Sequence, residues 1–155
     1  MNTELSFEEY FYSRFDKANG DQALRSIIYE LEKYEKYSHF NHLHLILCNQ
    51  NKTEYNYQFI AGNILLNLQP KCSTSISECI YPTLSTLNLS IKSYPFYLAY
   101  EFGLSVVQEY IREINIECLT NHQIRVMETY KYWLSMYSES SYHELRQRAS
   151  TPIKG

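Results

Sequence analysis

Glycine and proline are both scarce in this chain of 155 residues, with four of each. The glycines are Gly20, Gly62, Gly103 and Gly155. Glycines so far apart cannot form the G-x-x-x-x-G-K or G-x-G-x-x-G loops that cradle phosphates, so nucleotide binding by either route is excluded. A sheet-rich protein would also need more of both residues for its many turns.

Clustered positive charge is missing too. The formal net charge is −3, and no run of lysine or arginine is longer than a pair. Binding to a nucleic-acid backbone requires a clustered basic surface, because affinity comes from the release of counterions. The sequence therefore argues against direct nucleic-acid binding, whereas a basic protein partner fits its charge.

The chain shows no sign of a secretion signal or a membrane span. Its first residues are acidic and lack a basic segment followed by an apolar run. Apolar stretches such as 43–48 are far shorter than the roughly 20 residues needed to cross a bilayer. We therefore expect a cytoplasmic protein without membrane contact.

Metal-binding and catalytic motifs are missing as well. The four cysteines are scattered and form no C-x-x-C pair: Cys48, Cys72, Cys79 and Cys118. We interpret them as small buried hydrophobes whose apolar helical settings raise the thiol pKa and reduce reactivity. His39, His42 and His44 lie close together, but no H-E-x-x-H motif or matching carboxylate accompanies them, so we interpret them as structural. No G-x-S-x-G motif occurs, and we expect neither an enzyme nor a metal or cofactor.

Apolar residues recur every three or four positions, which predicts amphipathic helices throughout. In the first half of the chain, helices are expected over 6–19, 21–36, 38–49 and 53–68. From 75 on, Pro82 predicts either one kinked helix or two short helices, and a further element begins at Tyr94-Pro95. The last helices are expected over 104–114, over 120–138 and, as a short helix, from 141. Gly62 predicts a close approach between two helices. Three S/T-x-x-E/Q patterns predict capping boxes: Ser6 with Glu9, Thr120 with Gln123, and Ser141 with Glu144.

These helices predict an all-α protein with a single domain over 1–148 and a flexible tail over 149–155. About eight or nine antiparallel helices with short connections would form a bundle or an irregular stack. HEAT-like geometry with degenerate repeats is an alternative, although no fixed-period repeat is found.

Tyrosine is abundant, with sixteen residues. Tyrosine is favoured at protein interfaces, because it offers a large, stiff contact area and a hydroxyl that can stay hydrogen-bonded. The bias of an AT-rich genome is an alternative explanation. In the segment 93–103, Tyr97 and Glu101 lie four residues apart on one helix face and, with Tyr100, are candidate partner contacts.

The next helix carries Glu109 and Glu113 on one face, where like charges four residues apart repel by a few tenths of a kcal/mol. A basic partner would make the pair useful, and a solvated helix face is the alternative. Tyr132 lies off the apolar stripe of its helix and could belong to a contact ridge. The candidate partner-binding residues are Tyr97, Tyr100, Glu101, Glu109, Glu113 and Tyr132.

Three segments of the last part of the chain stand out: Tyr94-Pro95-Phe96-Tyr97-Leu98-Ala99 through Gly103, Tyr110-Ile111-Arg112-Glu113, and Glu128-Thr129-Tyr130-Lys131-Tyr132-Trp133-Leu134. Their layout resembles small all-helical bacterial immunity proteins, including those of contact-dependent growth inhibition (polymorphic toxin) systems. The resemblance covers roughly the last third of the chain. Such families have no invariant functional residues, so none is transferred to this sequence.

The resemblance implies a protein that binds the C-terminal toxin domain of a cognate effector, often a nuclease, and blocks its active site or substrate path. Acidic and aromatic side chains would supply steering and tight closure. A monomer or weak dimer is expected. The alternatives are a helical adaptor or scaffold that binds another protein or a peptide, and a small enzyme whose site is assembled across helices.

Overall fold

The structure is a computed structural model that describes residues 5–17 and 20–150. Over these residues it contains nine α-helices, three short 3-10 helices and no β-strand, which confirms the predicted all-α class. The helices are α1 (Phe7–Lys17), α2 (Gly20–Leu31), η1 (Lys36–Ser38), α3 (His39–Leu47), α4 (Tyr55–Leu68), α5 (Ile76–Ile80), η2 (Tyr81–Ser85), α6 (Ser93–Phe102), α7 (Leu104–Glu113), η3 (Ile116–Cys118), α8 (Asn121–Ser135) and α9 (Glu139–Ser150).

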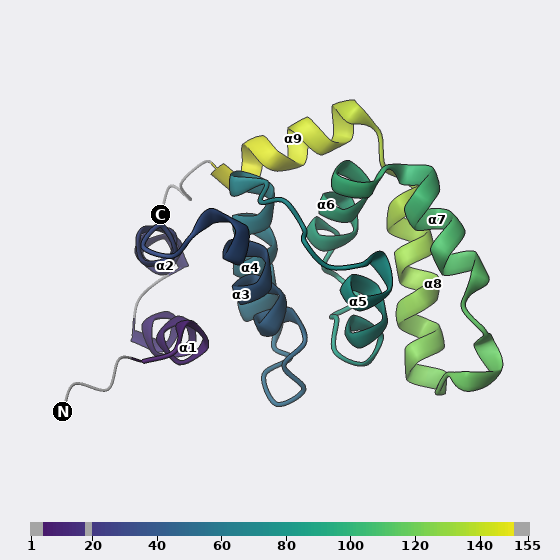
Figure 1. Cartoon of the computed structure of the whole chain (residues 1–155), viewed down its shortest axis with the longest axis horizontal. Helices are drawn as coiled ribbons and strands as arrows, with labels where there is room; N and C mark the ends of the chain where they lie inside the picture. The colour runs from purple at the N-terminus through teal and green to yellow at the C-terminus, as the bar shows by residue number, and fades with distance from the viewer. Residues whose placement is uncertain (1–4, 18–19, 151–155) are drawn as a thin grey trace.

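The helices are stacked in two rows. In one row α2, α4, α6 and α8 each pack against the next, and in the other α1 packs against α3 and α5 against α7. The side chain of His44 on α3 reaches the carbonyl of Cys79 on α5 at 3.2 Å and so continues the second row. Figure 1 shows α1 and α2 at one end and α7 and α8 at the other, with α9 crossing over α4 and α6. The architecture is therefore a stack of helix pairs.

Two of the three predicted capping boxes are confirmed. At the start of α1, the amide of Glu9 donates to Ser6 Oγ and the amide of Ser6 donates to the Glu9 carboxylate, both at 3.2 Å. At the start of α8, Thr120 and Gln123 exchange the same two bonds at 3.1 and 2.9 Å. Each box satisfies amides that the first turn of a helix leaves without partners.

The third capping box is wrong, because α9 is capped three residues earlier than predicted. The amide of Ser141 donates to Ser138 Oγ at 3.0 Å, and the amide of Ser138 donates back to Ser141 Oγ at 2.8 Å. Ser138 thus takes the capping position that we predicted for Ser141. Glu144 instead pairs with Arg148 at 3.0 Å, one turn further along the helix.

The last helix is fastened to the end of α4. Arg146 donates to the carbonyls of Leu66 and Asn67 at 2.9 and 3.2 Å, and the Asn67 amide donates to the Ala149 carbonyl at 3.1 Å. The helix continues to Ser150 and thus includes the first two residues of the tail predicted over 149–155. Residues 151–155 lie outside the described part of the chain.

Proline and glycine interrupt the helices where the sequence predicts. Pro82 occupies the second position of η2, and α5 ends directly before this short helix. The segment therefore contains two short helices, which is one of the two predicted alternatives. Gly103 lies between α6 and α7 with a φ of 94°, a conformation that favours glycine. For the first helix, the predicted end at Asn19-Gly20 falls partly outside the described residues, and Gly20 already belongs to α2.

Gly62 marks the close crossing of α4 and α6, as predicted. A Cβ atom at this position would stand 2.0 Å from Ser93 Oγ and 3.0 Å from Ser93 Cβ, so only glycine lets the two helices approach so closely. The Ser93 hydroxyl is buried at this crossing and has no hydrogen-bond partner among the described residues.

Five of the sixteen tyrosines are buried in the core, while six are exposed. Tyr94, Tyr97 and Tyr130 are fully buried, and burial raises the pKa of each hydroxyl well above its ordinary value. The hydroxyls stay satisfied: Tyr94 donates to the Cys79 carbonyl at 2.7 Å, and Tyr130 is hydrogen-bonded to Thr83 at 2.5 Å. These bonds tie the α5–η2 segment to α6 and α8.

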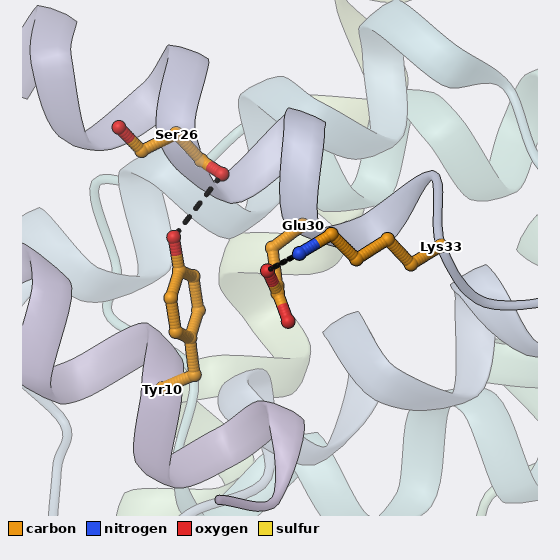
Figure 2. A network of polar contacts seen from close by, with 4 residues as sticks. All are labelled: Tyr10, Ser26, Glu30 and Lys33. Atoms are coloured by element: carbon orange, nitrogen blue, oxygen red, sulfur yellow. Dashed lines mark hydrogen bonds and ion pairs between the residues drawn. The ribbon is translucent and has the colours of Figure 1, made fainter. Parts of the chain in front are cut away.

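Figure 2 shows how α1 is attached to α2. The Tyr10 hydroxyl on α1 donates to the Ser26 carbonyl on α2 at 3.3 Å. Beside it, Lys33 pairs with Glu30 at 2.9 Å, and this pairing raises the pKa of Lys33. Exposed ion pairs of this kind contribute little to stability, so packing holds this end of the stack together.

Candidate functional site

Tyr97 does not lie where a partner could touch it. Its side chain has no exposed surface, and its hydroxyl donates to the carbonyl of Pro70 in the α4–α5 loop. The prediction of a partner contact at Tyr97 is therefore wrong. The reason is that α6 lies inside its row, and the α4–α5 loop covers the face that carries this residue.

Tyr100 and Glu101 are adjacent in sequence but lie in different surroundings. The Tyr100 ring is 47% exposed and stacks in parallel on Tyr142 of α9, with 4.7 Å between ring centroids. Glu101 is half-buried and accepts a bond from the backbone amide of Cys72 at 3.1 Å. Tyr100 is thus available to a partner, whereas Glu101 positions the α4–α5 loop.

Glu109 and Glu113 are both exposed on α7, at the end of the stack. Exposed apolar side chains accompany them, because Val106 is 48% exposed on the same helix and Ile116 is 51% exposed on η3. Glu117 follows on η3 and is also exposed. Carboxylates beside β-branched side chains form a surface that is both acidic and apolar.

Tyr132 lies on the exposed side of α8, with 57% of its surface accessible. Its ring packs edge-to-face against Trp133, with centroids 5.0 Å apart. Met136, one turn further along, is 50% exposed. The exposure of Tyr132 therefore agrees with its predicted place off the apolar stripe of the helix.

A groove of about 320 Å³ runs between α7 and α8. Its walls are Gln108, Ile111 and Arg112 from α7 and Lys131 and Leu134 from α8. We use the name α7–α8 surface for a set of exposed side chains on α7, η3 and α8 at this end of the stack. This surface is made up of Val106, Glu109, Arg112, Glu113, Ile116, Lys131, Tyr132 and Met136. Three of the six predicted partner residues lie on it.

A second groove, which sequence reasoning missed, has a volume of about 230 Å³ and lies where α6, α8 and α9 meet. Apolar Phe96, Trp133, Met136 and Leu145 line it, together with charged and polar residues. The Trp133 indole is held in place by donating to a loop carbonyl at 3.1 Å. No local pattern could reveal this groove, because its walls come from positions 92 to 148.

The clustered histidines take part in structural contacts. His39 Nε2 lies 3.2 Å from the carbonyl of Tyr34, and the His42 ring packs between Phe7 and Tyr34 at 5.2 and 4.6 Å. Burial lowers the pKa of His42 and His44. In the described part of the chain, no group of three or more His, Cys, Asp or Glu side chains is arranged to hold a metal ion.

The cysteines differ from the expectation of four inert, buried thiols. Burial raises the pKa of Cys48 to about 12, in agreement with that expectation. Cys118, however, is exposed. Cys72 Sγ lies 3.1 Å from Cys79 Sγ, and the hydrogen bond from Cys79 lowers the pKa of Cys72. Sequence analysis missed this pair because seven residues separate the two cysteines.

Comparisons with protein families, curated proteins and solved structures find no match for this chain. Among the described helices, none combines the length and the apolar character needed to traverse a bilayer.

Proposed function

We propose that this protein is an immunity protein that binds a cognate toxin domain and neutralises it through the α7–α8 surface. The observation that carries the proposal is the exposure of Val106 on the helix that carries the exposed carboxylates of Glu109 and Glu113, and of Ile116 on the following η3. Exposed apolar side chains on consecutive elements at the end of a stack mark a protein contact more specifically than single exposed residues do.

The distribution of charge supports a basic partner. Residues 93–120 contain four glutamates and one arginine, which equals the formal charge of −3 of the entire chain. Glu109 and Glu113 on this segment would face the positive substrate cleft of a nuclease and speed the encounter. Arg112 and Lys131 lie in the groove beside them, so the surface does not imitate a phosphate chain. Occlusion of the cleft or of its entrance is the mode of inhibition that fits best.

Tyr132 on α8 and Met136 directly after this helix supply the anchor. Tyr132 is stiffened by its edge-to-face contact with Trp133, so little conformational freedom is lost when a partner covers it. Met136 offers an adaptable apolar contact next to it. We expect the binding free energy to concentrate on these two residues, with the carboxylates setting orientation and association rate.

The proposal is tested by co-expression with the toxin-like product of the adjacent gene, followed by measurement of the affinity of the purified pair. Wild-type protein should restore growth. The variant Glu109→Lys/Glu113→Lys should weaken binding at least tenfold, about 1.4 kcal/mol, and should lose protection. Tyr132→Ala should weaken binding by about 2 kcal/mol or more, the loss expected for an aromatic hot spot.

A matched control is available at the other end of the stack. Glu32 and Glu35 follow α2 and are both exposed, so Glu32→Lys/Glu35→Lys changes the net charge by the same amount. This control should protect as well as wild type. Equal loss in both charge-reversal variants would point to net charge alone. Full protection by the α7 variant would reject the α7–α8 surface, and toxicity that wild-type protein does not relieve would reject the immunity function.

The second candidate is a helical adaptor that binds a short peptide. The groove between α6, α8 and α9 favours it, because Phe96 and Trp133 form an apolar wall and Lys92 stands 5.9 Å over the Trp133 ring. An extended peptide with one large apolar side chain would suit such a site. Trp133→Ala should abolish peptide binding, whereas Glu109→Lys/Glu113→Lys should leave it unchanged.

A further inference from the structure

Two thiols from different elements meet beside α6. Cys72 belongs to the α4–α5 loop and Cys79 to α5, and their sulfur atoms lie 3.1 Å apart. Thr74 Oγ1 stands 3.1 Å from Cys72 Sγ and 3.2 Å from Cys79 Sγ. The three side chains form one hydrogen-bonded cluster, which we call the dithiol cluster.

We propose that Cys72 and Cys79 are a redox-active dithiol, which a low-molecular-weight disulfide such as oxidised glutathione converts into an intramolecular disulfide. The sulfur–sulfur bond of a disulfide is about 2.05 Å long, so the two atoms must approach by about 1 Å. Both belong to one short loop–helix unit. Side-chain rotation at Cys72, together with a small adjustment of the loop, supplies this movement without displacing a long helix.

The surroundings assign different roles to the two sulfurs. Cys79 is fully buried, whereas Cys72 is only partly buried and can be reached by a small oxidant. The hydrogen bond from Cys79 lowers the pKa of Cys72, and the shared proton raises the pKa of Cys79. Cys72 is therefore the attacking thiolate and Cys79 the resolving thiol.

The reaction has two balanced steps. The Cys72 thiolate attacks one sulfur of oxidised glutathione, forms a mixed disulfide and releases one glutathione thiolate. That thiolate takes the Cys79 proton, and the Cys79 thiolate then attacks Cys72 Sγ and releases the second glutathione thiolate. The two cysteines lose two electrons, the oxidant gains them, and no metal is required.

The backbone around the dithiol cluster is already held against α6. The amide of Cys72 donates to Glu101, and the carbonyl of Cys79 accepts from Tyr94. A disulfide would therefore lock the α4–α5 loop to α5 in the position that it already occupies. We expect oxidation to leave the helical content unchanged. The other two cysteines differ, because Cys48 faces His44 at 3.3 Å and Cys118 is exposed on η3.

The test uses the full chain, incubated in buffers of increasing oxidised-to-reduced glutathione ratio. Thiols are counted after denaturation, and peptides are mapped by mass spectrometry. The reduced protein has four thiols. Oxidation should remove two of them and yield a linked peptide that contains Cys72 and Cys79. In Cys79→Ser, Cys72 should instead retain a glutathione adduct, because the resolving thiol is missing.

Cys118→Ser is the matched control, and it should still lose two thiols. The peptide map of wild-type protein needs no variant, so poor folding of Cys79→Ser would not prevent a decision. Wild-type protein that keeps both thiols under oxidising conditions would overturn the proposal. Modification of Cys118 alone would overturn it as well, because that result would identify only an exposed thiol. None of these outcomes depends on the partner of the α7–α8 surface.

Discussion

Replacing Gly62 by alanine should destabilise the protein, although alanine is the better helix former. In a helix interior, alanine is favoured over glycine by about 1 kcal/mol. At this crossing of α4 and α6, however, the added Cβ would stand 2.0 Å from Ser93 Oγ and 3.0 Å from Ser93 Cβ. Rotation of the serine hydroxyl relieves the first clash but not the second, because the backbone of α6 fixes the Ser93 Cβ.

The expected loss of unfolding free energy in Gly62→Ala follows from these two distances. Carbon atoms in good contact lie about 3.5–4.0 Å apart, so α6 must retreat by roughly 0.5–1 Å from α4. Overpacking of this kind costs about 1–3 kcal/mol, and the double clash at Gly62 belongs at the upper end of that range. After subtraction of the gain in helix propensity, the free energy of unfolding of Gly62→Ala should be about 2 kcal/mol lower than that of the wild type. Its Tm should fall by about 4–8 °C, given about 2–4 °C for each kcal/mol in a domain of this size.

Urea unfolding followed by circular dichroism would measure the effect. Asn56→Ala, at an exposed position of the same helix, is the control and should not destabilise the protein. Ser93→Ala removes the unpartnered hydroxyl and should be neutral or stabilising. The double variant Gly62→Ala/Ser93→Ala should lose less unfolding free energy than the two single variants together, by at least about 0.5 kcal/mol. If Gly62→Ala equals or exceeds the wild type in stability, the close crossing does not exist.

Three further predictions concern other parts of the molecule. Thr120→Ala should lose about 1 kcal/mol of unfolding free energy, because its hydroxyl caps α8; Thr120→Ser should not. Arg146→Ala should lose about 1–2 kcal/mol and increase amide exchange in α9, since two bonds to the end of α4 disappear. The hydrogen bond from Cys79 lowers the pKa of Cys72, so the thiolate persists to lower pH than in an ordinary cysteine. The alkylation rate of Cys72 should therefore reach half its plateau below about pH 8.5, and Cys79→Ser should move that midpoint upward.

Helix starts could be predicted from sequence where the decisive contacts are local. Ser6 and Glu9, or Thr120 and Gln123, are three residues apart, so the chain brings them together as soon as the first turn forms. At the start of α9, two serines are available as the capping residue. Ser138 forms the cap, although Ser141 is the serine with a glutamate three residues further on. The capping pattern alone could not rank these two starts.

The candidate site was only partly accessible from sequence. Glu109, Glu113 and Tyr132 lie on faces that amphipathic spacing marks as exposed, and the structure places them at one end of the stack. Spacing could not tell that Tyr97 is buried and Tyr100 exposed. Seven consecutive residues of α6 are buried, from 93 to 99, so this helix has no polar stripe from which an exposed face could be inferred.

The sequence by itself determined the helical class, most helix boundaries and the close approach at Gly62, because these follow from hydrogen bonds and side-chain spacing within a few residues. Only the tertiary structure decided that Tyr97 is covered, that α7 packs against α8 at the end of the stack, and that Cys72 meets Cys79. Burial and proximity depend on which distant elements arrive beside a residue, and one sequence contains no direct record of those neighbours.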